Sequence, residues 1–379
     1  MRIAIITLPL HINYGGILQA YALQTVLERM GHTVEILQKK DLSFHNKWLM
    51  PLVYAKRLVK KIFFDKTICL LAEKKELRER AICQQHTSRF INTYINLRQV
   101  DCLSDVSESD YDVIVVGSDQ VWRRIYYAKI YRNIMLSVNP ADAFLKFAEN
   151  WNVKKVAYAA SFGVDSWEYT SEETKDIILL VQKFDNVSVR EDSGVELCQK
   201  YLGRSVQHVI DPTMLLNKLD YERLFKVSNT LCCRGSLVSY ILNPSNNKTR
   251  LVEHIAKERG WQAVELNSKV ENGSASIEER IHPPVEQWLK GIYEANFVVT
   301  DSFHACVFSI LFSKPFVVLA NQERGNARLV SLMKMFNLEK HLLTSINDYT
   351  FSDDYNISSS VFDKLRDYQL RAKEFLSQI

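Results

Sequence analysis

Residues 297–321 constrain the fold of this chain more than any other stretch. They read FVVTDSFHACVFSILFSKPFVVLAN, with two runs of β-branched and aromatic residues (297–300 and 315–319) around an apolar run of helical length (305–312). This order predicts a strand, a polar turn at 301–304, a helix and a second strand. Such a unit requires a parallel sheet, so the sequence predicts an α/β fold.

The polar turn of this unit holds the first candidate site residues, Ser302 and His304. Ligands of open parallel sheets bind at the carboxyl ends of the strands, where the chain enters a helix. Histidine is the one residue type in this turn whose charge changes near neutral pH, which suits proton transfer. The structural alternative is that Ser302 caps the helix and His304 only occupies its first turn.

The N-terminal segment repeats this alternation. An apolar run at 3–8 predicts a buried strand, the turn Asn13-Tyr14-Gly15-Gly16 opens a helix, and a second strand follows at 33–37. The segment lacks a G-x-G-x-x-G pattern, so a dinucleotide is not indicated. Gly15 and Gly16 either offer backbone N–H groups to an anion or let helix and strand pack closely.

Polar side chains follow the other predicted strands of both halves. In the first half these residues are Ser118, Asp119, Gln120, Ser161 and Arg190, and in the second half they are Arg324 and Arg328. Because such groups lie at the carboxyl ends of parallel strands, we expect them to meet across a cleft between two sheets. Arginines and one histidine there suit a small anionic substrate and proton transfer.

A change of domain is predicted at Asp211-Pro212-Thr213, because proline disfavours a helix before it. The sequence therefore divides into an N-terminal Rossmann-like domain at 1–213 and a C-terminal one at 214–358. The last helix, at 359–379, has no strand after it, and we expect it to join the first domain.

Charge and cysteine usage exclude several classes of protein. Lysine and arginine exceed aspartate and glutamate by only four charges, which does not favour nucleic-acid binding. Seven cysteines without a C-x-x-C pair suit a reducing compartment, so a cytoplasmic location is expected. The chain shows no metal-ligand spacing, no phosphate-binding lysine loop and no G-x-S-x-G pattern.

A basic amphipathic segment lies within 41–98. Apolar residues recur at helical spacing and basic residues stand beside them, namely Trp48, Leu52, Ala55, Val59 and Ile62 with Lys56, Arg57, Lys60 and Lys61. One interpretation is peripheral association with a membrane surface. The other is a helix that packs on its own domain with its lysines in solvent.

Seven motifs in this order resemble the polysaccharide pyruvyl transferase family. They are NYGGILQAYALQ, VGSDQVW, KVAYAASFG, VSVREDSG, VIDPTMLL, VTDSFHACVFSILFSKPFVV and the stretch around NQERGNAR. The resemblance implies two facing Rossmann-like domains with a cleft between them, similar to the glycosyltransferase-B type fold. It is poor over 41–105, 123–150 and 220–290, which carry no motif.

The resemblance also implies an activity. Members of the family transfer pyruvate from phosphoenolpyruvate to two hydroxyls of a sugar, here expected to be galactose-type, and so form a cyclic ketal in a capsular or other surface polysaccharide. Phosphoenolpyruvate is the donor substrate, and no metal or other cofactor is expected. The acceptor is expected to be a lipid-linked repeat unit at the inner face of the membrane.

Site residues follow from the same resemblance. The family's motif histidine falls on His304 and its strand-end arginine on Arg190, which implies catalytic roles. Substrate binding is implied for the remaining motif positions, which are Asn13, Gly15, Gly16, Gln19, Ser118, Asp119, Gln120, Ser161, Ser302, Arg324 and Arg328. Another branch carries Arg-Leu-His where this chain has Ser302-Phe303-His304, so Arg324 or Arg328 is expected to supply the missing charge.

Three hypotheses about function remain open at this point. The first is pyruvyl transfer, in which an imidazolium protonates the methylene carbon of the enol-phosphate and arginines hold its anionic groups. In this scheme Asp119 or Glu191 either accepts the hydroxyl protons or is a helix cap or ion-pair partner. The alternatives are a nucleotide-sugar-dependent glycosyltransferase of the same architecture and a non-catalytic sugar- or anion-binding module.

Overall fold

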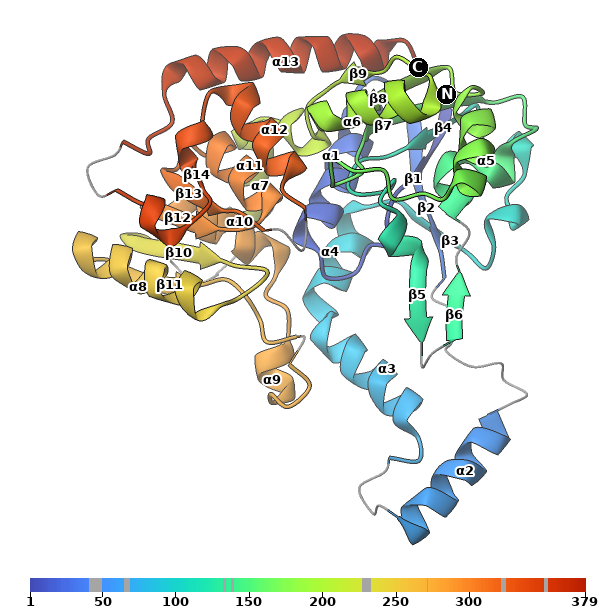
Figure 1. Cartoon of the computed structure of the whole chain (residues 1–379), viewed down its shortest axis with the longest axis horizontal. Helices are drawn as coiled ribbons and strands as arrows, with labels where there is room; N and C mark the ends of the chain where they lie inside the picture. Colours follow the sequence, from blue (N-terminus) through green and yellow to red (C-terminus); the bar gives the residue numbers. More distant parts are fainter. Residues whose placement is uncertain are drawn as a thin grey trace.

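In the computed structural model the chain folds into two parallel sheets, each with helices on both faces (Figure 1). The structure describes residues 1–40, 50–64, 69–131, 134–137, 140–226, 233–270, 272–321, 325–350 and 354–379. The predicted α/β architecture with two Rossmann-like units is confirmed.

The first sheet has seven strands in the order β3-β2-β1-β4-β7-β8-β9. These strands are β1 (Arg2–Ile6), β2 (Thr33–Lys39), β3 (Leu97–Val100), β4 (Val113–Val116), β7 (Lys154–Ala160), β8 (Asn186–Val189) and β9 (Gln207–His208). Alternate residues of β1 enter different cores, since Ile3 and Ile5 pack with one helical layer and Ala4 with the other. An unbroken apolar run thus gives a strand buried on both faces, as the sequence predicted.

The second sheet has five strands in the order β11-β10-β12-β13-β14. They are β10 (Ser236–Tyr240), β11 (Gln262–Glu265), β12 (Phe297–Thr300), β13 (Phe316–Leu319) and β14 (Leu342–Leu343). Val298 and Val318 face the large core that continues into the first half, whereas Val299 and Val317 face a smaller core beneath one helix. The first sheet ends at His208 and the second begins at Ser236; the domain boundary at 213 and 214 stays a prediction.

Helices connect the strands much as the hydrophobic periodicity predicted. Their bounds are α1 (Tyr14–Arg29), α2 (Met50–Phe63), α3 (Ala72–Cys83), α4 (Gln85–Tyr94), α5 (Ser171–Val181), α6 (Asp192–Leu197), α7 (Lys218–Phe225), α8 (Asn246–Arg259), α9 (Ile277–Arg280), α10 (Val285–Glu294), α11 (Phe303–Leu311), α12 (Ala327–Phe336) and α13 (Ser359–Ser377). The expected start of the central helix at 305 is wrong by two residues. Ser302 is its N-cap and accepts a hydrogen bond from the Ala305 backbone N–H, so α11 begins at Phe303.

Two features were not predicted from the sequence. The first is strand β3, which is four residues long and carries no strong apolar alternation. The second is a two-stranded ribbon of β5 (Ala128–Tyr131) and β6 (Ile134–Ser137), in a segment that the sequence left unassigned. Both are short elements whose pairing depends on partners distant in the sequence or on local turn geometry.

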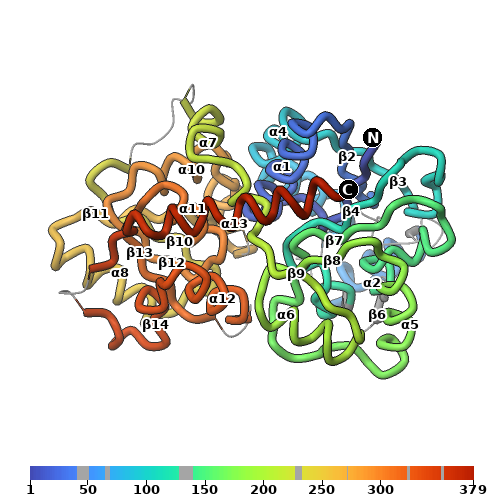
Figure 2. The backbone as a smooth tube through the Cα atoms, turned by 90° about the horizontal axis from the view of Figure 1, so that it is seen from above, coloured from blue at the N-terminus to red at the C-terminus, as the bar shows by residue number. Residues whose placement is uncertain are grey.

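Helix α13 runs across the top of both halves, as the view from above shows (Figure 2). Tyr368 packs on Phe336 of the second half, and Phe375 packs on Tyr158 of β7 in the first half. The Gln369 side chain also donates a hydrogen bond to the backbone carbonyl of Met214. The helix therefore contacts both halves and the segment between them.

A second connection between the halves lies at the start of α1. Tyr14 stacks on Trp288 of α10 at a ring separation of 5.2 Å. Its hydroxyl donates to the Pro283 carbonyl at 2.7 Å and lies 3.1 Å from His282 Nδ1. Because that single hydroxyl proton is used on Pro283, His282 must be the donor in the second bond. Neutral His282 therefore carries its proton on Nδ1.

Burial lowers the pKa of His282 to about 4, well below the ordinary value near 6.5. The folded chain thus prefers neutral His282, while the unfolded chain takes up a proton on acidification. The stabilisation that comes from burying neutral His282 is complete above about pH 6.5, and it decreases as the pH drops towards the folded-state pKa.

We predict that the unfolding free energy of the wild type falls when the pH is lowered from 7 to 5. The fall should be about 2 kcal/mol larger than that of His282→Gln, which lacks the titrating group. Urea unfolding of both proteins at the two pH values measures this difference. His254→Gln is the matched control, because His254 is exposed on α8. Equal losses in wild type and His282→Gln would contradict this assignment.

Candidate active site

The two sheets direct their carboxyl ends towards one cavity of about 710 Å³ between the halves. Both halves contribute predicted site residues to its lining, which are Asn13, Gly15, Gly16, Asp119, Gln120, Ser302, His304 and Arg328. Gln19, Ser118, Ser161 and Arg190 do not line the cavity and lie behind its wall. Arg324 lies outside the described residues.

Gly15 lies directly against the His304 ring. A Cβ atom built on Gly15 would stand 1.9 Å from His304 Nδ1, a separation that no real Cβ contact tolerates. Asn13 Oδ1 accepts the Gly15 N–H at 3.1 Å and thereby caps α1. Gly15 therefore gives room to the histidine of the other half, a contact that neither interpretation of this glycine pair named.

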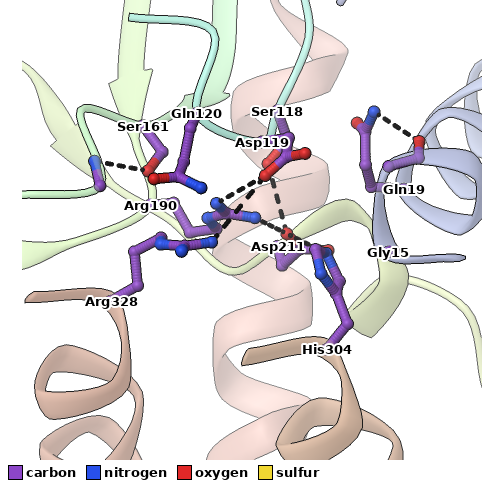
Figure 3. Close-up of polar contacts among 12 residues, drawn as sticks. Gly15, Gln19, Ser118, Asp119, Gln120, Ser161, Arg190, Asp211, His304 and Arg328 are labelled. Atoms are coloured by element: carbon purple, nitrogen blue, oxygen red, sulfur yellow. Dashed lines mark hydrogen bonds and ion pairs between the residues drawn. The ribbon is translucent and has the colours of Figure 1, made fainter. Parts of the chain in front are cut away.

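His304 lies in the first turn of α11 and points across the cavity towards the first half (Figure 3). Its side chain is buried, and its Nε2 atom lies 3.5 Å from Oδ2 of Asp211. Ser302 does cap the helix, as the structural alternative held, but His304 is also brought to a carboxylate of the opposite half. The turn can therefore cap α11 through Ser302 and direct His304 towards Asp211 at the same time.

Asp211 is the buried centre of the cluster and was predicted only as part of a domain boundary. Its carboxylate accepts hydrogen bonds from Arg190 Nη1 at 2.5 Å, from the Thr213 hydroxyl at 2.6 Å and from the Thr213 N–H at 2.9 Å. Burial alone would raise the pKa of Asp211, but His304, Arg190 and Thr213 together hold it well below its ordinary value. Asp211 is thus a fixed negative charge facing the imidazole.

The signal that could have identified Asp211 was present in the sequence. Asp211 closely follows the short strand β9, just as Arg190 follows β8 in the same sheet. Its position before Pro212 favoured the boundary interpretation instead.

Arg190 links the two carboxylates behind the cavity wall. Its second guanidinium nitrogen lies 3.5 Å from Oδ1 of Asp119, and its guanidinium carbon lies 4.5 Å from the centre of the Phe303 ring. Burial opposes the charge of Arg190, but Asp211, Asp119 and Glu191 raise its pKa above the ordinary value. The charge of Arg190 is therefore matched within the protein.

Arg328 is held differently, although it approaches the same ring. Its guanidinium carbon lies 5.7 Å from the Phe303 centroid, and Nη1 lies 3.9 Å from Asp119 Oδ1. Burial, together with repulsion from Arg190, lowers the pKa of Arg328 to about 10. Arg328 nevertheless stays charged at neutral pH, so this lining residue makes its corner of the cavity the candidate site for an anion.

Asp119 occupies a constrained position at the end of β4. Its φ angle is 68°, in the left-handed region that disfavours most side chains. Backbone bonds hold it there, because its carbonyl accepts from the N–H groups of Val121 and Ser161. The side chain accepts a hydrogen bond from Asn13 Nδ2 at 3.3 Å, which ties the α1 turn to the carboxylate pair.

The remaining predicted residues support the walls of the site. Ser161 donates to Glu191, whose same oxygen also accepts the N–H groups of Phe162 and Gly163. Gln19 donates to the Gly16 carbonyl and the Thr7 hydroxyl, and the Ser118 hydroxyl donates to Asp211 at 3.3 Å. Of the two carboxylates named as candidate proton acceptors, Glu191 therefore organises a loop, whereas Asp119 reaches the cavity.

In the part of the chain that the structure describes, no group of three or more histidine, cysteine, aspartate or glutamate side chains is placed to hold a metal ion.

Comparison with known proteins agrees with the geometry. The family described as "Polysaccharide pyruvyl transferase" matches residues 13–323. No match is found among curated proteins.

Similar solved structures include the UDP-GlcNAc 2-epimerase of Methanocaldococcus jannaschii, 11% identical over 100% of both chains with a TM-score of 0.48. An alpha-glucosyltransferase in complex with UDP is 11% identical over 99% of this chain and 94% of its own, with a TM-score of 0.43. The ADP-heptose lps heptosyltransferase II of E. coli is 12% identical over 98% of this chain and 100% of its own, with a TM-score of 0.35. These likenesses concern the fold alone.

We predict that inorganic phosphate stabilises the wild type and that Arg328→Gln abolishes this response. At ten times its dissociation constant, a ligand bound only by the folded state adds about 1.4 kcal/mol to the unfolding free energy. Thermal unfolding with and without phosphate measures the response within each protein. Arg250→Gln, an exposed change on α8, should respond as the wild type does. A response retained by Arg328→Gln would place the anion elsewhere.

Proposed function

Because the chain belongs to the polysaccharide pyruvyl transferase family, we propose that it transfers the pyruvyl group of phosphoenolpyruvate to two hydroxyls of a sugar in a surface polysaccharide, with galactose-type acceptors favoured. The product is a cyclic ketal, and inorganic phosphate is released. One observation carries the proposal: His304 of one half faces Asp211 of the other, beside an arginine-lined corner of a shared cavity.

In this proposal Arg328 binds the donor. Phosphoenolpyruvate carries a carboxylate and a phosphate, and a guanidinium pairs with either in bidentate geometry. Arg328 lines the cavity, whereas Arg190 stays behind the wall and holds Asp211 and Asp119 in place. Arg190 is therefore a positioning residue in the state described, and its direct contact with the donor stays a prediction.

His304 supplies the proton that makes the donor electrophilic. Protonation of the methylene carbon leaves an oxocarbenium-like centre at the carbon that bears the phosphate oxygen. The buried Asp211 carboxylate orients the ring, since its nearest oxygen is 3.5 Å from Nε2. This arrangement contributes a rate factor of about 10²–10⁴.

The remaining steps balance without another reactant. The first sugar hydroxyl adds to the electrophilic carbon and loses its proton, the C–O bond to phosphate breaks, and the second hydroxyl closes the ring with loss of its proton. One hydroxyl proton restores His304 and the other leaves with the phosphate. In this proposal Asp119, one of the carboxylates that line the cavity, accepts a hydroxyl proton.

The deciding experiment incubates the protein with phosphoenolpyruvate and a panel of free, nitrophenyl and lipid-linked sugars. Phosphate release and mass spectrometry are followed together. A sugar that gains one pyruvyl ketal, with one phosphate released for each ketal, supports the proposal. Turnover only with a nucleotide sugar would replace it with glycosyl transfer, and sugar binding without turnover with any donor would replace it with a binding module.

We predict that His304→Ala lowers turnover at least about 10²-fold, because the proton donor is lost. His304→Gln keeps much of the volume without the proton and should be impaired to a similar extent. His254→Ala on α8 is the control, and both active-site variants should keep their far-ultraviolet circular dichroism. A loss of less than about tenfold would rule out a general-acid role for His304.

We predict that Gly15→Ala impairs turnover because the added methyl group collides with the His304 ring. The new methyl group would stand 1.9 Å from His304 Nδ1, so the ring or the α1 turn must move, and small displacements of a catalytic group cost about 10²-fold. Gly273→Ala is the matched control, since nothing lies within 4 Å of a Cβ built there. Full activity in Gly15→Ala would show that the close approach of these two groups is not needed for catalysis.

A further inference from the structure

Helix α2 presents its apolar face to solvent. A turn of 100° per residue places Leu52, Ala55, Val59, Ile62 and Phe63 on one continuous side, and all five are exposed. Leu52 is 68% exposed, Ile62 62% and Phe63 72%. An amphipathic helix in a globular domain normally turns this face to the core, so α2 is inverted relative to that pattern.

The opposite side of α2 faces the protein. Arg57 is buried and forms two hydrogen bonds with Glu73 of α3, at 2.6 and 2.5 Å, and a third with the Leu70 carbonyl. The sequence placed Arg57 beside the apolar stripe with Lys56, Lys60 and Lys61, but the structure holds it in an ion pair with Glu73. Its guanidinium instead fixes the rotation of α2 and holds the apolar stripe outward. Trp48, the first residue of the predicted stripe, lies outside the described residues.

The charge of the segment has one sign. Residues 50–64 contain four basic and no acidic side chains. Lys56 and Lys60 are exposed and flank the apolar stripe on the side of Leu52 and Phe63. Long lysine side chains beside a buried apolar face can extend their ammonium groups towards anionic headgroups.

We propose that α2 is a docking surface for an anionic lipid bilayer, with its apolar stripe in the headgroup–acyl boundary and Lys56 and Lys60 on the lipid phosphates. A second copy of the chain is disfavoured as the occupant, because two such faces would bring lysines of like charge together. None of the helices in the described part of the chain is long and apolar enough to cross a membrane, so the contact is peripheral. Figure 1 shows α2 standing apart from both sheets, beyond α3.

Docking through α2 would also hold the cavity near the bilayer. Strand β2 ends at Lys39, which lines the cavity, and α2 begins at Met50. Eleven residue steps of extended chain span at most about 40 Å. A membrane-bound acceptor sugar would therefore be within the reach of a docked enzyme. The docking itself does not depend on the reaction proposed above.

The test is co-sedimentation of the full chain with vesicles of phosphatidylglycerol and phosphatidylcholine at 3:7, and with phosphatidylcholine vesicles alone. The wild type should bind the anionic vesicles at low salt, and raising the salt should weaken binding. Lys56→Glu with Lys60→Glu should weaken it at least about 30-fold, since each lost basic residue costs about a factor of five. Leu52→Ser, Val59→Ser and Ile62→Ser together should also abolish binding without changing charge.

Matched controls separate docking from general electrostatics. Arg250→Glu with Lys257→Glu makes the same charge change on exposed residues of α8 and should leave binding unchanged. Turnover of all variants on a water-soluble acceptor should equal that of the wild type, which keeps this test distinct from the test of the reaction.

Three results would overturn the proposal. The first is that the wild type does not bind anionic vesicles at low salt. The second is that the α8 control loses as much vesicle binding as the Lys56 and Lys60 variant. The third is that the wild type does not bind vesicles but is a dimer in sedimentation velocity, and that the serine variant is a monomer. The last result would assign the face to a second copy of the chain.

Discussion

The buried carboxylate of Asp211 is the constraint on which this structure depends. A carboxylate removed from water is costly unless several donors and an opposite charge surround it. Arg190, Thr213 and Ser118 of the first half supply part of that environment, and His304 of the second half completes it. The electrostatic stability of Asp211 therefore depends on the approach of the two halves, and the same approach assembles the cavity.

Glycines make this approach possible at two places. Gly15 leaves room for the His304 ring, and a Cβ on Gly325 would stand 2.0 Å from the Gly163 carbonyl oxygen. Gly325 also has a φ of 82°, in the left-handed region where glycine carries no steric penalty. At Gly15 the first turn of α1 meets the His304 side chain of the other half, and at Gly325 a loop meets the backbone of the Gly163 loop. Their small size is thus a requirement of the closed cavity and not of either sheet alone.

Sequence reasoning worked where one local pattern determined the outcome. Strands β12 and β13 of the unit 297–321 were predicted to within one residue, because burial on both faces demands unbroken apolar runs. It failed where a role depends on a distant partner. Asp211 acquires its role from His304, Arg190 lies behind the wall because two carboxylates hold it there, and α2 is turned outward by Arg57 and Glu73. The pairings themselves leave no periodicity in the sequence, although the position of Asp211 after a strand could have marked it as a candidate.

The electrostatics of the cavity also support the proposal that an anion binds in it. Arg190 and Arg328 approach one aromatic ring, and Asp119 lies within ion-pair distance of both. Asp211 bonds directly to Arg190, whereas the pKa of Arg328 falls to about 10 because burial and Arg190 disfavour its charge. Under the proposed function, a phosphate or carboxylate of the donor would add a negative charge at this corner and stabilise the buried guanidinium of Arg328, so part of the affinity for the donor would come from this charge pairing.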